Sequence, residues 1–177
     1  ALNNLGVSYK AGNNIDLAIF YFRKAIYLKP EYPEALNNLG NTYRELGNLK
    51  DAINHLTQAI SLKPTFAEAL NNLGTAYEEE EKFSASIDCY EKAIKFKPDY
   101  PEAYFNLANS LRSQGHIKKA IKYYKHAINL KPYFPSAYKN LSLAELLSND
   151  YESGWIHHEW RWKIKNSKKP HAEPKSK

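Results

Sequence analysis

Asparagine is the residue type whose chemistry and spacing stand out in this sequence. One asparagine recurs every 34 residues, at Asn4, Asn38, Asn72, Asn106 and Asn140. Its side-chain amide offers N–H donors and a carbonyl acceptor, which match the polar groups of a peptide main chain. A regular row of such amides could therefore bind the backbone of an extended peptide. A second, partial row lies at Asn3, Asn37 and Asn71, which we also expect to bind the peptide, and becomes Phe105 and Lys139 in the last two units.

No other group of residues indicates chemistry. His157, His158 and Glu159 resemble part of a zinc-protease helix, but Trp162 stands where the second histidine would be needed. The 7 glycines lie at repeat positions and turns and form no phosphate-binding loop. We therefore expect no catalytic residues, metal or cofactor in this chain. His157 to Glu159 are interpreted as helix surface, and Cys89 as a structural residue.

Charge is unevenly distributed. The net charge of +6 comes from residues 161–177, which carry seven Lys or Arg and one acid, whereas residues 1–160 carry 18 of each sign. A neutral body argues against a nucleic-acid partner. No apolar run reaches the ~18–20 residues of a membrane span, and a single cysteine cannot form an internal disulfide. We therefore expect a cytoplasmic protein with no nucleic-acid or membrane partner, and the oligomeric state stays open.

Other repeated positions predict the elements that must present the asparagines. Proline, leucine and alanine also recur every 34 residues, at Pro30, Pro64, Pro98 and Pro132, at Leu5, Leu39, Leu73, Leu107 and Leu141, and at Ala25, Ala59, Ala93 and Ala127. In residues 33–66, apolar spacings of three and four predict one helix before Gly47 and another from Leu49 to Pro64. Thr65 and Asp99, each three residues before a glutamate, indicate capping boxes. Each unit is therefore a predicted helix pair in an all-α chain.

These residues resemble the tetratricopeptide repeat (TPR) family. In the second unit the family's signature positions are Leu39, Gly40, Tyr43, Ala52, Leu56, Ala59 and Pro64. The resemblance implies an all-α fold, the α-α superhelix: a right-handed TPR solenoid of stacked antiparallel helix pairs. It also implies that the first helix of each pair lines a concave groove. We expect four repeats in residues 1–134, divided as 1–32, 33–66, 67–100 and 101–134, with the first incomplete at its start.

The end of the chain departs from the family pattern. Ser142, Glu145, Gly154, His158 and Arg161 replace the usual residues of the signature. Because terminal repeats are commonly atypical, residues 135–164 are interpreted as a divergent fifth repeat acting as a C-terminal cap. Trp155, Trp160 and Trp162 are expected to pack on the fourth and fifth units. Residues 165–177 are expected to be a basic linker or tail, and the array is expected to continue upstream as part of a longer protein.

The family's groove positions, carried onto this chain, place the main asparagine row on the concave face. This resembles the asparagine ladder of the O-linked N-acetylglucosamine transferase superhelix, where such residues hold the substrate main chain. The resemblance implies a protein–protein interaction module that binds an extended peptide or partner protein. Adjacent helices lie ~8–10 Å apart and a polyproline-II chain advances ~9 Å per turn, so one asparagine would serve about one turn of ligand. Five rungs suggest affinities of about micromolar order.

Several alternatives stay open at this point. The asparagines could instead brace their helices. A carboxylate clamp would need Lys and Asn at the sites of Asn3 and Val7, and later cations are too scattered to form one. Residues 149–162 resemble the module that ends TPR arrays in many bacterial proteins before a catalytic domain. The chain could therefore be the substrate-recognition arm of a glycosyltransferase. The acidic run Glu78 to Glu81 is either a solvated turn or a docking patch for basic residues.

Overall fold

The computed structural model describes residues 1–166, with side chains through Trp160. Of the predicted tail, only Lys165 and Asn166 lie in this range, in the last helix. The described residues form ten α-helices: α1 (Leu2–Ala11), α2 (Ile15–Leu28), α3 (Pro33–Glu45), α4 (Leu49–Leu62), α5 (Ala67–Glu79), α6 (Phe83–Phe96), α7 (Pro101–Ser113), α8 (Ile117–Leu130), α9 (Pro135–Leu147) and α10 (Tyr151–Asn166). One helix pair falls in each predicted repeat, and α10 runs past the boundary expected at 164.

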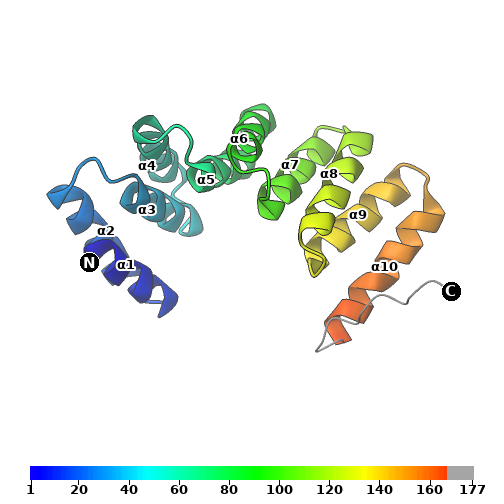
Figure 1. The fold of residues 1–177 in the computed structure, drawn as a ribbon, viewed down its shortest axis with the longest axis horizontal. Helices are drawn as coiled ribbons and strands as arrows, with labels where there is room; N and C mark the ends of the chain where they lie inside the picture. The colour runs from blue at the N-terminus through cyan, green and yellow to red at the C-terminus, as the bar shows by residue number, and fades with distance from the viewer. Residues whose placement is uncertain (167–177) are drawn as a thin grey trace. The chain divides into compact units, whose positions relative to one another are not determined.

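The chain divides into two compact units, which meet at Pro98 and Asp99 in the sequence. In the first unit the pairs α1–α2, α3–α4 and α5–α6 pack internally, and α2 packs on α3 as α4 does on α5 (Figure 1). The second unit repeats this order with α7 to α10. Within each unit, the first helices of neighbouring repeats also contact one another, as in α1–α3, α3–α5 and α7–α9. The described second helices make no such contacts, so the first helices line the inner face of each unit.

Small residues let the two helices of a repeat approach closely. A Cβ atom added to Gly40 would lie 2.8 Å from Leu56 Cγ, and one added to Gly74 would lie 2.6 Å from the Tyr90 ring. Buried alanines repeat along the same contacts, including Ala18, Ala52, Ala59 and Ala93. Phe22, Leu56, Tyr90 and Tyr124 fill the remaining space with fully buried side chains.

The turn inside each helix pair has one left-handed residue. These residues recur every 34 positions, at Asn13, Gly47, Glu81, Gly115 and Asn149, with φ between 58° and 78°. Glycine and asparagine adopt this conformation readily, whereas a glutamate does so at a cost of ~1–2 kcal/mol. The third repeat therefore carries backbone strain at Glu81.

Replacing Glu81 by glycine should raise the free energy of unfolding by about 1 kcal/mol, because the strain is relieved and glycine's extra unfolded-state entropy offsets only part of it. Thermal unfolding followed by circular dichroism measures the change. The matched control is Gly47→Ala. No atom lies within 4 Å of the added Cβ, so its loss of about 1 kcal/mol would report φ alone. A destabilised Glu81→Gly chain would contradict the assignment of strain.

The predicted capping boxes are wrong. The N-cap residues of α5 and α7 are Phe66 and Tyr100, and not Thr65 and Asp99. Within the described residues, neither helix has a hydrogen bond from its N-terminal N–H groups to a capping side chain. The first-turn glutamates instead pair with lysines at the end of the same repeat, in Glu34–Lys63, Glu68–Lys97 and Glu102–Lys131. The hydrogen bond from Lys97 lowers the pKa of Glu68. Each pair ties the start of the repeat to its end.

The fifth repeat has a buried carboxyl group, that of Glu145, where the fourth repeat has Leu111. Glu145 Oε2 lies 2.6 Å from His157 Nδ1 of α10, so the interpretation of His157 as helix surface is wrong. Trp160 stacks on Tyr138 at 5.3 Å between ring centroids, as expected for a tryptophan that packs on this repeat. Trp155 is 59% exposed and does not pack as predicted. The side chain of Trp162 lies outside the described residues.

Candidate functional site

The main asparagine row lies on the first helices, which line the inner face of each unit. Asn4 is exposed, whereas the four later members of the row are half-buried: Asn38, Asn72, Asn106 and Asn140. The partial second row is buried, with only 7–8% of each residue exposed at Asn3, Asn37 and Asn71. The two rows therefore differ in their access to a ligand.

The two rows are joined by hydrogen bonds between neighbouring repeats in the first unit. Asn38 Nδ2 donates to Asn3 Oδ1 at 3.0 Å, and Asn72 Nδ2 donates to Asn37 Oδ1 at 2.9 Å. Each half-buried amide is thus held by a buried amide of the preceding repeat. An asparagine side chain has two N–H groups and an acceptor oxygen, and this bond uses one N–H. The arrangement braces the repeats and also fixes the orientation of the outer amide.

The second unit orients Asn140 differently. Phe105 occupies the buried row, and Asn140 Nδ2 instead donates to Asn109 Oδ1 at 2.8 Å. The same oxygen accepts a 2.7 Å hydrogen bond from the hydroxyl of Tyr124, a fully buried side chain. Asn109 is a functional candidate that the sequence reasoning missed. Its signal is weak, because only Asn41 shares both its register and its residue type.

Charged side chains flank the amides on the inner face of the first unit. Arg44 Nη1 lies 2.5 Å from Glu79 Oε1 of the next repeat, and Arg44 Nη2 donates to Asn41 Oδ1 at 3.0 Å. Lys10 and Glu45 form the corresponding pair one repeat earlier, at 3.0 Å. This face therefore alternates amides with ion pairs that bridge repeats.

The acidic run at the end of α5 is largely engaged within the molecule. Glu79 pairs with Arg44, and Glu80 lies 2.8 Å from Lys82. The hydroxyl of Tyr90 donates to Glu78 at 2.8 Å, and burial together with this carboxylate raises the pKa of Tyr90. These contacts favour the interpretation of a charged turn over a docking patch.

The inner face of the second unit is more apolar. Leu143 and Leu147 are 43% and 62% exposed on α9. They stand in register with Asn41 and Glu45 of the second repeat. Each unit thus presents a different chemistry beside its asparagines.

The described residues offer little for other site types. Among residues 1–160, no three His, Cys, Asp or Glu side chains gather into a metal-binding group. None of the helices in the described part of the chain is long and apolar enough to cross a membrane. Phe66 packs beside Leu36 of the second repeat and Ala69 of the third, and the Phe134 ring lies 5.0 Å from the Phe105 ring within the fourth repeat.

Comparisons with known proteins agree with this architecture. Family models described as tetratricopeptide repeat match residues 1–32, 21–54 and 101–134, and one described as TPR repeat matches 40–80 and 76–111. A search of curated proteins finds no match. The glycosyltransferase association stays a prediction.

Several solved structures are similar over nearly the whole chain. A crystal structure of MamA is 30% identical with a TM-score of 0.80, covering 91% of this chain and 94% of that one. PilF of Pseudomonas aeruginosa is 18% identical with a TM-score of 0.86 (92% and 74% covered). TTC0263, a thermophilic TPR protein of Thermus thermophilus, is 19% identical with a TM-score of 0.76 (94% and 91% covered). These matches confirm the predicted fold class, and the chain belongs to the tetratricopeptide repeat family, with the fold of a protein-interaction scaffold.

Proposed function

We propose that the inner face of each unit binds an extended segment of a partner protein, and that the asparagines of the main row hydrogen-bond its main chain. The observation that carries this proposal is the cross-repeat pairing of Asn38 with Asn3 and of Asn72 with Asn37. Pairing of this kind fixes the outer amide before a ligand arrives, which lowers the ordering cost of binding. The outer amide keeps a further N–H and an acceptor oxygen, which match the C=O and N–H of an extended backbone.

The buried row has a positioning role in this proposal. Asn3, Asn37 and Asn71 are buried, so we expect them to orient the outer amides and not to touch the ligand. In the second unit, we expect Asn109 to orient the amide of Asn140 in the same way. The proposed contact residues are therefore Asn4, Asn38, Asn72, Asn106 and Asn140.

Side-chain preference would come from the surroundings of the asparagines. The ion pairs around Arg44 favour polar or charged ligand side chains in the first unit. Exposed Leu143 and Leu147 favour an apolar ligand side chain in the second. Since each net hydrogen bond contributes roughly 0.5–1.5 kcal/mol, main-chain contacts alone would give weak binding, and these side-chain contacts would add selectivity.

The probe is a 12-residue peptide, selected from a random library for binding to the full chain. The variant Asn38→Ala/Asn72→Ala should raise its Kd about tenfold, because two main-chain hydrogen bonds are lost. Isothermal titration calorimetry measures the change. N-methylation of individual peptide amides should weaken binding more than alanine replacement of most ligand side chains.

The matched control removes two asparagines from the outer helices, in Asn54→Ala/Asn129→Ala. Both control residues are exposed on second helices, α4 and α8, so peptide affinity should stay within twofold of the wild-type value. Circular dichroism should show the same helical content in all three proteins. An unchanged Kd in the Asn38/Asn72 variant, with its fold intact, would refute the proposed contact.

A further inference from the structure

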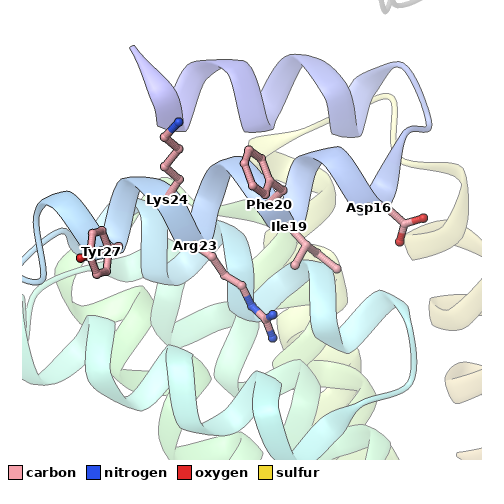
Figure 2. A pocket seen from close by; sticks show the side chains of 6 residues that line it. All are labelled: Asp16, Ile19, Phe20, Arg23, Lys24 and Tyr27. Carbon is pink, nitrogen blue, oxygen red and sulfur yellow. The ribbon is translucent and has the colours of Figure 1, made fainter.

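The outward face of α2 differs from those of the other second helices. It contains an open hollow of about 410 Å³, lined by Asp16, Ile19, Phe20, Arg23, Lys24 and Tyr27 (Figure 2). At 100° of rotation per residue, Phe20 and Tyr27 lie opposite the buried stripe of Ala18, Phe22 and Ala25. The hollow therefore faces away from α1 and from the inner face.

Register-equivalent positions show that this pair of exposed aromatic residues is specific to the first repeat. Phe20 and Tyr27 correspond to Asn54 and Ser61 in α4, to Asp88 and Lys95 in α6, and to Lys122 and Asn129 in α8. In α10 the first position is Ile156, which is also exposed, and the second is Lys163. The second repeat has a neighbour on each side, and its Asn54 and Ser61 are nevertheless exposed. A repeat stacked before α1 would therefore leave Phe20 and Tyr27 accessible, so this surface calls for a different occupant.

Phe20, one of the two exposed aromatic residues of this surface, is held in place by neighbouring rings. Phe20 is 53% exposed and Tyr27 is 84% exposed. Phe20 packs edge-on against Tyr21 at 5.3 Å, and Tyr21 stacks on Tyr9 of α1 at 5.2 Å. Exposed aromatic side chains that are already ordered are typical of residues that dominate binding interfaces.

Two cations border these rings. Arg23 donates a hydrogen bond to the Tyr43 hydroxyl of α3, and Figure 2 shows its side chain directed toward that helix. Lys24 Nζ lies 5.8 Å from the centre of the Phe20 ring. The acid that lines the hollow, Asp16, stands at the start of α2, apart from Tyr27 near its end (Figure 2). Charge complementarity therefore favours a partner that combines apolar side chains with carboxylates.

We propose that this face of α2 docks an amphipathic helix of a partner protein, with an apolar stripe bordered by carboxylates. The stretch from Asp16 to Tyr27 covers ~16 Å, or about three helical turns, which suits a helix packed alongside α2. Phe20 and Tyr27 contact the apolar stripe of the partner helix, and Arg23 and Lys24 pair with its carboxylates. This interface is separate from the inner face and does not depend on the peptide-binding function.

The test uses the full chain and a labelled 18-residue peptide with leucine at helical spacing and glutamate elsewhere. Fluorescence anisotropy gives its Kd, and the matched peptide has lysine in place of every glutamate. We expect the glutamate peptide to bind at least fivefold more tightly than the lysine peptide. The variant Phe20→Asn/Lys24→Gln/Tyr27→Ser, which installs the residues of the second repeat, should raise the Kd at least fivefold.

The control variant Asp88→Asn/Lys92→Gln/Lys95→Ser installs the same residues on α6. Both triple variants lower the net charge by one, so they separate the α2 surface from a change in overall charge. The control should keep the Kd within twofold. Equal losses in the two variants, or equal affinities for the two peptides, would overturn the proposal. Sedimentation that shows a concentration-dependent dimer, abolished by the α2 variant, would assign the face to a second copy and also overturn it.

If the α2 triple variant loses its cooperative melt, the single variant Tyr27→Ser replaces it. Tyr27 is among the most exposed side chains of the first repeat, so its loss should leave folding unchanged. We expect at least a threefold rise in Kd for the glutamate peptide. An unchanged Kd in the folded single variant would overturn the proposal.

Discussion

A thiol reagent at pH 8 is expected to modify Cys89 about 100-fold more slowly in the folded chain than in urea. The thiol is buried in a cluster with Leu56, Leu73 and Ala76, and burial raises its pKa to about 11. An ordinary cysteine has a pKa of about 8.5. Since the thiolate is the reacting species, the folded chain holds roughly two orders of magnitude less of it at pH 8. Ellman's reagent measures both rates.

A control protein separates burial from the overall reactivity of the chain. In a Cys89→Ala background, Ser61→Cys places a thiol at an exposed position of α4, where we expect rapid modification in the folded state. If Cys89 reacts as fast as this surface thiol, then α6 opens on the timescale of the reagent, and the packing between the second and third repeats is less stable than its burial indicates.

The raised pKa of Cys89 also makes the stability of the fold depend on pH, with a fixed sign. Because the pKa of the thiol is higher in the folded chain than in the unfolded chain, the free energy of unfolding falls as pH rises above about 9, where the unfolded thiol ionises first.

Much of the fold could be predicted because one constraint repeats. A helix pair cannot bury its apolar face alone, so each unit needs the same small and large residues at the same places. Gly40 against Leu56 and Gly74 against Tyr90 are two results of this constraint. The period therefore predicts helix number and turn position together, and the resemblance to the family adds the inner face. The prediction of capping boxes was wrong because the glutamates of both motifs, Glu68 and Glu102, pair instead with Lys97 and Lys131 at the end of the same repeat.

The candidate site was predicted less completely than the fold. Residue type and spacing identify both asparagine rows, but they do not say that Asn72 bonds Asn37, because that contact depends on how neighbouring repeats stack. The aromatic face of α2 is hidden for another reason. Phe20 and Tyr27 sit at positions that the family pattern leaves variable, so a search for repeated residues passes over them. Comparison between repeats, position by position, would find such exceptions.

The burial of Glu145 illustrates the same limit in the cap. Its position in the fourth repeat is taken by Leu111, and His157 stands in register with Tyr123. From the sequence alone, these are two unrelated substitutions by polar residues on different helices. They become a pair only when α9 and α10 pack, which brings Nδ1 of His157 to 2.6 Å from the carboxylate.

Replacing His157 by alanine is expected to lower the free energy of unfolding of the second unit by roughly 2–4 kcal/mol. Glu145 is fully buried, and His157 is its hydrogen-bonding partner. Lys125 Nζ lies 3.0 Å from the other carboxyl oxygen of Glu145, Oε1, but this contact is not a well-directed hydrogen bond. The Lys125 side chain is 51% exposed. The alanine variant would leave a buried carboxylate with this one partner, which is a large cost. Urea unfolding followed by tryptophan fluorescence measures it, because all three tryptophans lie in α10.

The double variant Glu145→Leu/His157→Tyr distinguishes a charge effect from a packing effect. It installs the residues of the fourth repeat and leaves Lys125 able to reach water, so its stability should lie within about 1 kcal/mol of the wild-type value or above it. The neighbouring substitution His158→Ala serves as the control, and it should cost about 1 kcal/mol or less. Equal losses for His157→Ala and His158→Ala would contradict the argument. If the double variant were instead as unstable as His157→Ala, the histidine would matter for its shape and not for the carboxylate it holds.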